Sequence, residues 1–221
     1  LITCTSYRHL VQDGTFLLTK VNESPVITLF LYYVLPRSFT TFCFQYLCNK
    51  VNYVVRKSLE NAVQMEYKAL TDDMTGAYNK NRLIELLNNR ERDGQDIAVI
   101  YWDVNQLKYV NDNWGHLCGD RLITEVAKTI QSIAREEDIV IRYGGDEFLL
   151  YVANGTKEIA EQLIKTWKVR LEEEKKRENY EFPVSASVGY ALGKHSQLKD
   201  IIAAADKDMY ANKRICRESA K

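Results

Sequence analysis

The sequence predicts an α/β fold in which a small sheet is packed between helices. Short runs rich in β-branched and aromatic residues are typical of strands, and stretches with apolar residues at helical spacing lie between and around them. A Gly-Gly pair at 144–145 separates two of the short runs, which is the signal of a tight β-hairpin. We therefore expect an α/β sandwich with strands near residues 97–103, 139–143, 147–152 and 184–191.

Composition limits the function before any motif is considered. The 221 residues are enough for one full domain and part of a second. The 30 Lys and Arg balance the 30 Asp and Glu, which argues against nucleic acid as a partner, so any phosphate binding must come from a local arrangement. The five cysteines are scattered without a CxxC pair, which indicates free thiols in a reducing, cytoplasmic compartment: Cys4, Cys43, Cys48, Cys118 and Cys216.

Residues 1–50 differ in composition from the rest and are expected to be a fragment of an N-terminal sensor or membrane region. An apolar run over 26–35 is interrupted by Pro36-Arg37 and resumes over 39–47. The two runs approach the roughly 20 apolar residues of a membrane span, but the interruption and the many Thr and Tyr residues weaken that interpretation. We favour the tail of a soluble sensor domain, with a membrane tether of the parent protein as the alternative. Since the chain opens on Leu1 and no signal peptide can be read, we expect a piece of a longer protein.

Residues 51–70 are expected to form a helical linker. Val55, Leu59 and Leu70 recur at roughly helical intervals with charged residues between them, and neither Pro nor Gly interrupts the stretch. Such a helix would be a surface helix of the following domain, or it would pair with its copy in a homodimer. The heptads are too few to establish a coiled coil, so both interpretations remain open.

The remaining residues, 71–221, are expected to form one domain that begins with a polar, turn-rich entry over 71–80. The apolar spacing predicts helices over 82–90, 107–114, 121–134, 157–177 and 198–215. The first of these helices is expected to turn four apolar side chains inward: Leu83, Ile84, Leu86 and Leu87.

A nearly continuous apolar run over 97–102 predicts a central strand that is covered on both faces. The run ends in Asp103, and a carboxylate at the end of a buried strand is costly unless it is paired or binds a cation. Mg²⁺ prefers oxygen ligands and accepts one or two carboxylates together with substrate phosphates. Asp103 would meet Asp146 and Glu147 if the two strands are neighbours in one sheet. The connection that follows is too rich in polar residues to be explained by packing alone: Lys108, Asn111, His116 and Asp120.

The predicted hairpin over 139–152 is the second stretch that indicates chemistry. Gly144 and Gly145 can both take positive φ at no steric cost, so we expect them to turn the chain and to let a ligand approach the backbone. Asp146 and Glu147 follow at the rim of a hairpin that is otherwise apolar.

Gly-Gly-Asp-Glu-Phe over 144–148 is the signature of the diguanylate cyclase (GGDEF) family, which the chain resembles over about residues 70–217. The family pattern after the first strand runs Asp-x-Asp-x-Phe-Lys-x-x-Asn-Asp-x-x-Gly-His-x-x-Gly-Asp. The chain departs from it at Asn105, where Asp is usual, and at Leu107, where Phe is usual. It matches the pattern at Asp103, Lys108, Asn111, Asp112, Gly115, His116, Gly119 and Asp120. The resemblance implies a palm-like fold shared with nucleotide cyclases and polymerases, with a central, mostly antiparallel sheet flanked by helices.

The resemblance also implies a site. A metal ion, Mg²⁺ or Mn²⁺, would be held by Asp103, the carbonyl of Val104 and Asp146. Asn111 and Asp120 resemble the pair that reads guanine, and Lys213 and Arg217 match positions that contact phosphates. The whole substrate-binding set implied in this way is Lys108, Asn111, His116, Asp120, Gly144, Gly145, Lys213 and Arg217.

Arg135 and Asp138 precede the hairpin at the offset where the family carries its inhibitory product site. Arg135 would then clamp a phosphate or a guanine edge, and Asp138 would accept a hydrogen bond from the base. The alternative is a surface ion pair at a helix end, which contributes at most about 1 kcal/mol.

The resemblance implies condensation of two GTP molecules into cyclic di-GMP with release of two pyrophosphates. Asp146 would be a metal ligand and the proton acceptor, and Glu147 would support it. Because each subunit would hold one GTP, a homodimer is expected, inhibited by its product and controlled through the linker helix. The alternatives are a catalytically silent domain that binds GTP or cyclic di-GMP as a signal, and another nucleotide cyclase or polymerase palm. The guanine-reading pair argues against the latter.

Overall fold

The computed structural model describes residues 33–218, with side chains up to Arg214. The chain divides into two compact units, Leu1–Val63 and Gln64–Lys221. Most of the region expected to be a sensor or membrane fragment falls on residues 1–32, which lie outside the described part of the chain.

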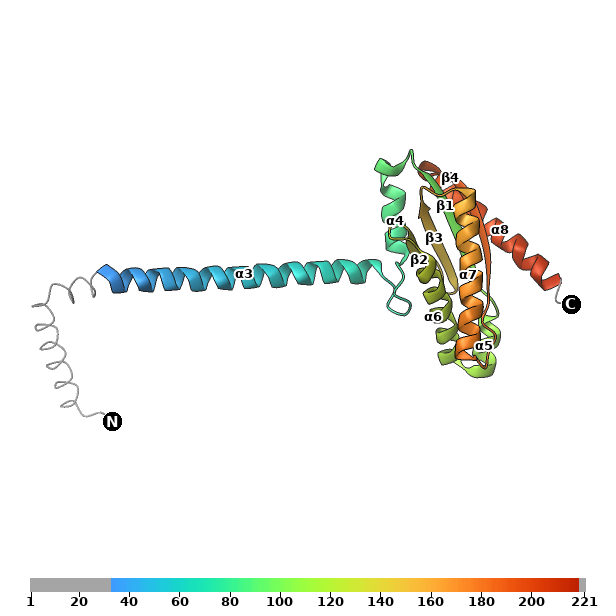
Figure 1. Ribbon diagram of the computed structural model, residues 1–221, viewed down its shortest axis with the longest axis horizontal. Coiled ribbons are helices and arrows are strands. Elements are labelled where there is room, and N and C mark those ends of the chain that lie inside the picture. The colour runs from blue at the N-terminus through green and yellow to red at the C-terminus, as the bar shows by residue number, and fades with distance from the viewer. Residues whose placement is uncertain (1–32, 219–221) are drawn as a thin grey trace, which may run out of the picture. The chain divides into compact units, whose positions relative to one another are not determined.

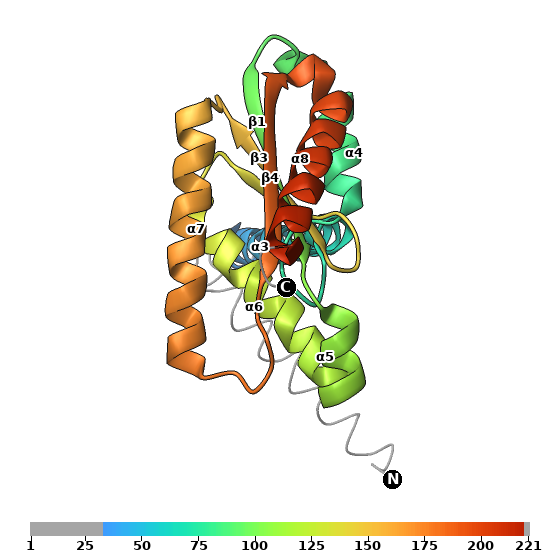
Figure 2. The same cartoon turned by 90° about the vertical axis from the view of Figure 1, so that its right-hand side faces the viewer.

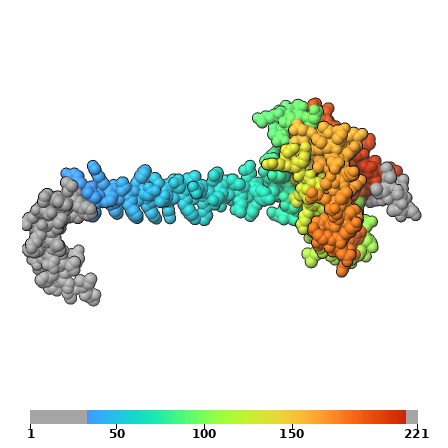
Figure 3. Space-filling model, in the orientation of Figure 1, coloured from blue at the N-terminus to red at the C-terminus, as the bar shows by residue number. Residues whose placement is uncertain are grey.

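The first described element is α3 (Leu35–Leu70), a single helix of 36 residues (Figure 1). The helix therefore begins well before residue 52, where we expected it to start, and it passes through Pro36-Arg37, which interrupt the apolar run of the sequence. Pro36 lies in the first turn, where its missing N–H has no intrahelical partner to lose. None of the residues of α3 is buried, and most of them are exposed (Figure 3). No helix in the described part of the chain is both long and apolar enough to span a membrane.

The second unit is built on one sheet of four strands, each pair antiparallel, in the order β2-β3-β1-β4. This arrangement confirms the predicted α/β fold with an antiparallel sheet flanked by helices. The strands lie close to their predicted positions, and β4 begins and ends slightly later than expected. Their bounds are β1 (Asp96–Val104), β2 (Ile139–Arg142), β3 (Glu147–Ala153) and β4 (Ala186–Lys194).

Five α-helices and two short 3₁₀ turns complete this unit (Figure 1). The helices are α4 (Lys80–Asn88), α5 (Leu107–Trp114), α6 (His116–Ile133), α7 (Lys157–Glu178) and α8 (Leu198–Glu218). The 3₁₀ turns are η2 (Arg90–Arg92) and η3 (His195–Gln197). Compared with the expected ranges, α6 begins earlier, because Gly115 alone separates it from α5.

The sheet has a separate core on each face. Figure 2 shows α6 and α7 on one side of the strands and α4 and α8 on the other. On the α6–α7 side, Trp102 and Trp167 meet edge to face with ring centroids 5.7 Å apart. On the α4–α8 side, Tyr151 and Met209 are buried. Leu83 and Leu86 of α4 are buried in this core and Leu87 packs partly against it, whereas Ile84, which we also expected to face inward, is 54% exposed.

A buried histidine joins three elements on the α4–α8 side. His195 Nε2 lies 2.9 Å from the carbonyl of Leu86, and Nδ1 lies 3.0 Å from the hydroxyl of Tyr151. Since a carbonyl can only accept, Nε2 carries the proton and Nδ1 accepts from the tyrosine. Both ring nitrogens of this buried residue are thereby paired, as burial requires.

Close packing of α8 against β4 depends on a glycine. A Cβ placed on Gly189 would lie 2.0 Å from the backbone nitrogen of Met209 and 2.6 Å from its Cα. Glycine within a strand often marks such a close approach of another backbone. Because the obstructing atoms belong to the backbone of α8, no side-chain rotation can make room.

Gly189→Ala is expected to destabilise the domain by about 3 kcal/mol, since α8 must move away from the sheet. The change should be measured by urea unfolding followed by circular dichroism. Gly94→Ala is the matched control, because a Cβ at Gly94 meets nothing within 4 Å. Equal unfolding midpoints for the two variants would contradict this account of the α8 packing.

Candidate active site

Three acidic residues lie at one end of the sheet because of the strand register. Asp103 on β1 lies directly opposite Glu147 on β3. The next residue, Val104, donates its N–H to the carbonyl of Asp146 at 2.9 Å. Asp103, Asp146 and Glu147 are all partly buried. We refer to Asp103, Val104, Asp146 and Glu147 as the acidic corner.

A lysine neutralises part of the acidic corner. Lys213 of α8 donates a hydrogen bond to Oδ1 of Asp103 at 2.5 Å, and the two side chains are only 16% and 19% exposed. An ion pair with this little exposure is screened less than one at the surface. Arg217 lies one turn further along α8, and its side chain falls outside the described part of the chain.

The acidic corner fits a hard divalent cation by its donor chemistry. Its donors are carboxylate oxygens and the Val104 carbonyl. Lys213 shows that Asp103 accepts a positive charge at this position. Among the described residues no group of three or more His, Cys, Asp and Glu side chains is arranged to hold a metal ion alone. Mg²⁺ commonly binds through one or two carboxylates and completes its shell with substrate phosphates and water. The residues therefore fit a cation that arrives together with a phosphorylated ligand.

The Gly-Gly turn differs from our expectation. Neither Gly144 nor Gly145 has positive φ; among the described glycines only Gly76 and Gly115 do. The chain reverses over a longer loop, closed by hydrogen bonds from the N–H groups of Tyr143 (2.8 Å) and Gly144 (3.2 Å) to the carbonyl of Glu147. A Cβ on Gly144 would lie 2.2 Å from Oε2 of Glu147. A side chain at position 144 would thus displace the Glu147 carboxylate that lies against Gly144, and the positive-φ argument was wrong.

An ion pair that the sequence analysis missed holds this turn from outside. Arg142 donates to both carboxylate oxygens of Asp72, at 2.9 and 3.0 Å, and to the carbonyl of Gly145, at 2.7 and 3.2 Å. Thr75 donates twice more to Oδ1 of Asp72. Partial burial tends to raise the pKa of Asp72, but hydrogen bonds from Thr75 and Arg142 and the Arg142 charge outweigh it, so the pKa is lowered. Seventy residues separate Asp72 from Arg142, and no local pattern predicts the pair.

The polar residues of the connection after β1 lie on α5 and α6. Gln106 has φ 58°, so the chain turns sharply from β1 into α5. Lys108, His116 and Asp120 are exposed, whereas Asn111 is partly buried. Asn111 fits between the helices because a Cβ on Gly119 would lie 2.0 Å from its Oδ1. The structure thus brings Asn111 beside the turn of α6 that precedes Asp120.

Arg135 and Asp138 are paired with each other. Arg135 donates from Nε (2.9 Å) and Nη2 (2.7 Å) to the Asp138 carboxylate, and from Nη2 to the carbonyl of Ala153. These hydrogen bonds raise the pKa of Arg135. The Asp138 side chain is fully buried and also accepts from the N–H groups of Arg135 and Ala153. Both residues precede β2, at the opposite end of that strand from the Gly-Gly turn.

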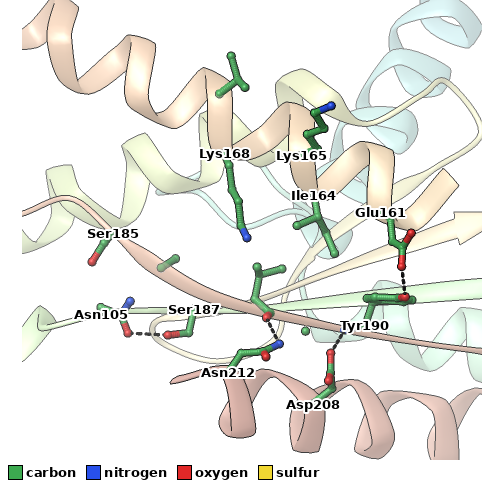
Figure 4. Close-up of a pocket in the computed structure, with 14 residues that line it drawn as sticks. Asn105, Glu161, Ile164, Lys165, Lys168, Ser185, Ser187, Tyr190, Asp208 and Asn212 are labelled. Atoms are coloured by element: carbon green, nitrogen blue, oxygen red, sulfur yellow. Dashed lines mark hydrogen bonds between the residues drawn. The ribbon is translucent and has the colours of Figure 1, made fainter. Parts of the chain in front are cut away.

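A groove of about 800 Å³ runs along the free edge of β4, between α7 and α8 (Figure 4). Side chains of α8 bond the outward backbone of β4: Asp208 accepts from the N–H of Tyr190, and Asn212 donates to the carbonyl of Val188. Asn105 borders this groove and accepts a hydrogen bond from Ser187 at 3.0 Å. Asn105, at the position of a usual aspartate, therefore serves to join β1 to β4.

The chain is similar to known proteins over most of its length. Residues 69–219 match the family model described as "Diguanylate cyclase, GGDEF domain". The probable diguanylate cyclase DgcJ of Escherichia coli is 33% identical over 167 residues, which cover 70% of this chain and 33% of DgcJ. The cyclic di-GMP phosphodiesterase PdeR of the same organism is 34% identical over 149 residues, covering 66% of this chain and 22% of PdeR. The chain thus spans a third or less of these two relatives.

Among solved structures, the chain is similar to the coiled coil and GGDEF domain of DgcB from Caulobacter crescentus, a complex with cyclic di-GMP. The TM-score is 0.65 and the sequences are 25% identical. The match covers 77% of this chain and 94% of the other.

Asp72→Asn is expected to destabilise the domain by about 1–2 kcal/mol at neutral pH, because the charged hydrogen bonds to Arg142 are weakened. The folded-state pKa of Asp72 lies below its ordinary value of 3.8, so the stabilisation is complete above that pH. It is lost as the pH falls through the lower folded value, so the two proteins should converge in acid. Urea unfolding across pH measures this, with Asp73→Asn as control since Asp73 is exposed. A difference that persists unchanged in acid would contradict the assigned pair.

Proposed function

The chain belongs to the GGDEF family of diguanylate cyclase domains, and on that premise we propose that it condenses two GTP molecules into cyclic di-GMP and two pyrophosphates. The observation that carries the proposal is the acidic corner, in which the strand register brings Asp103 opposite Glu147 and beside Asp146. The proposed cyclase domain covers residues 71–221 and follows a helical linker over residues 51–70.

Substrate binding is assigned to side chains around the acidic corner. Asn111 and Asp120 would read guanine, the Asp by accepting from the base N–H groups, with His116 close by on the same helix pair. Lys108, Lys213 and Arg217 would neutralise the phosphates. The chain enters α5 directly after the acidic corner, and the free N–H groups at a helix start favour phosphate oxygens. Gly144 and Gly145 would line the same site from the hairpin.

The metal ion is proposed to be Mg²⁺, or Mn²⁺ in its place. Asp103, the carbonyl of Val104 and Asp146 would hold it. When bound, such an ion offsets phosphate charge and lowers the pKa of a nearby hydroxyl. Lys213 would then leave Asp103 and turn to the phosphates, so that its charge is used both with and without substrate.

In the reaction, the 3′-oxygen of one GTP forms a bond to the α-phosphorus of the other, and the bond from that phosphorus to pyrophosphate breaks. Asp146 is proposed to accept the proton of the hydroxyl, and Glu147 to support it. Lys108, Lys213 and Arg217 stabilise the charge that develops on the leaving pyrophosphate. The step occurs twice to close the ring.

Because one subunit holds one GTP, catalysis requires two copies of the domain, and α3 is the proposed contact. Most of the stability of a helix in a protein comes from packing of one of its faces, and none of the residues of α3 is buried. A stripe with a spacing of three and four residues runs along it, mostly apolar with polar positions at Asn49, Arg56 and Glu60. Its apolar members are exposed: Leu35, Phe39, Phe42, Tyr46, Tyr53, Val63 and Tyr67. The coiled coil named for DgcB supports pairing of two copies through this stripe.

Arg135 and Asp138 are proposed as an inhibitory site for cyclic di-GMP. The Arg135 side chain is 33% exposed, whereas Asp138 is fully buried and saturated by protein donors. Arg135 would therefore make the first contact with a phosphate or guanine edge. Asp138 would hold Arg135 in place and would meet the base only if this pair opened.

Incubation with GTP and Mg²⁺ is expected to yield cyclic di-GMP, identified by chromatography and mass spectrometry. Asp146→Ala should lower the rate by at least about 10²-fold, because it removes both a cation ligand and the proton acceptor. Asp112→Ala is the control, because it removes an exposed aspartate on α5 outside the acidic corner. No product at high protein concentration, together with tight binding of cyclic di-GMP, would instead identify a receptor.

Phe42→Glu is expected to weaken dimerisation and to lower the specific activity at low protein concentration, because it places a charge in the proposed helix contact. Phe44→Glu is the matched control: the two rings are 69% and 68% exposed, but Phe44 lies off the stripe. Sedimentation velocity and activity as a function of concentration measure both effects. Equal behaviour of the two variants would contradict the assignment of the stripe.

A further inference from the structure

A buried tyrosine lies next to the acidic corner. Tyr101 is on β1, two residues before Asp103, so the two side chains point to the same face of the sheet. It is 2% exposed. In the register of β1 and β3, Tyr101 is opposite Leu149 and Asp103 is opposite Glu147. Tyr101 and Glu147 are therefore diagonal neighbours on one face, a separation that a tyrosine and a glutamate can bridge.

The Glu147 side chain has little freedom on its other side. A Cβ built on Gly144 would lie only 2.2 Å from Oε2 of Glu147, so the carboxylate is packed against the Cα of Gly144. The carbonyl of Glu147 accepts from Tyr143 and Gly144, which fixes the backbone beneath it. The carboxylate is thus confined between the Gly-Gly turn and β1.

The ring of Tyr101 is itself held in place. Tyr143 meets it edge to face, with centroids 5.9 Å apart and planes at 68°. The ammonium group of Lys80 lies 5.1 Å from the centroid of the Tyr143 ring. The strand register and this ring contact thus keep Tyr101 on the face of the sheet where Glu147 lies.

We propose that Tyr101 is a positioning residue that donates a hydrogen bond to the Glu147 carboxylate and holds it against Gly144, ready for the cation and nucleotide. This inference rests on the proposed cyclase function. Without the hydroxyl, the Glu147 carboxylate can move away from the Gly-Gly turn. Each binding event must then also overcome the entropic cost of ordering this carboxylate. Tyr101 touches neither substrate nor cation; it acts through Glu147.

Tyr101→Phe removes only the hydroxyl. We expect the Mg²⁺ concentration for half-maximal activity to rise about three- to tenfold, while the rate at saturating Mg²⁺ falls less than about twofold. Binding of Mn²⁺ in the presence of a non-cyclisable GTP analogue, followed by electron paramagnetic resonance, should weaken by the same factor. Unchanged Mn²⁺ affinity in Tyr101→Phe would overturn the proposal.

Tyr151→Phe is the matched control for lost packing or stability. It removes one buried hydroxyl from the same face of the sheet, where Tyr151 is bonded to His195 rather than to the acidic corner. It should lower the melting temperature but leave the Mg²⁺ and Mn²⁺ dependence as in the wild type. An equal shift of metal dependence in both variants would indicate a structural effect and overturn the proposal.

A double-mutant comparison separates this inference from the proposed function. If Tyr101 acts through Glu147, Tyr101→Phe should add nothing to the Mn²⁺ affinity of Glu147→Gln, whereas fully additive losses would overturn the proposal. If the wild type makes no cyclic di-GMP, the cyclase proposal fails, but the Mn²⁺ measurements still decide the role of Tyr101. A wild type that binds no Mn²⁺ with the GTP analogue would overturn both.

Discussion

The pairing of β1 with β3 is the interaction on which the acidic corner depends. Seven residue pairs, from Ile97 opposite Ala153 to Asp103 opposite Glu147, set a single register. Because side chains alternate between the two faces, a slip of one residue would turn Asp103 into the α6–α7 core and Trp102 out of it. Trp102 and Phe148 are both fully buried on that side, so such a slip would expose large aromatic surfaces. The cost of exposing the core thus fixes the position of the carboxylates.

The central place of β1 explains how carboxylates can lie at the end of a buried strand. β1 is paired on both sides, with β3 and with β4. α8 packs on the face of the sheet to which the Asp103 side chain points. The close approach at Gly189 brings α8 near enough for Lys213 to reach Asp103. Partial burial makes an unpaired carboxylate costly, and the ammonium offsets that cost. Packing at the middle of α8 and ion pairing near its end are therefore parts of one arrangement.

Most of the fold could be predicted because its signals are local: β1 to β3 are runs of aliphatic and aromatic residues, β4 alternates small polar and apolar residues, and the helices show helical spacing. The meeting of Asp103 with the hairpin acids could also be anticipated, since it needs only two neighbouring strands. Contacts between distant segments could not be anticipated, such as Asp72 with Arg142. The glycine argument failed for a related reason, because Gly144 lies against the Glu147 carboxylate and does not have positive φ. Local patterns predict conformation, whereas these features depend on which side chains meet.

On the proposed function, charge balance favours a cation that binds together with a phosphorylated ligand. The acidic corner holds three acidic residues and one ammonium, which is paired with Asp103, so about two negative charges remain to be neutralised when all three are ionised. A divalent cation alone would compete with Lys213 for Asp103. A nucleotide that brings both the cation and its own phosphates provides new partners for Lys213 and for the carboxylates at once. We infer that cation and nucleotide bind cooperatively here, because either one alone leaves a partly buried charge without a partner.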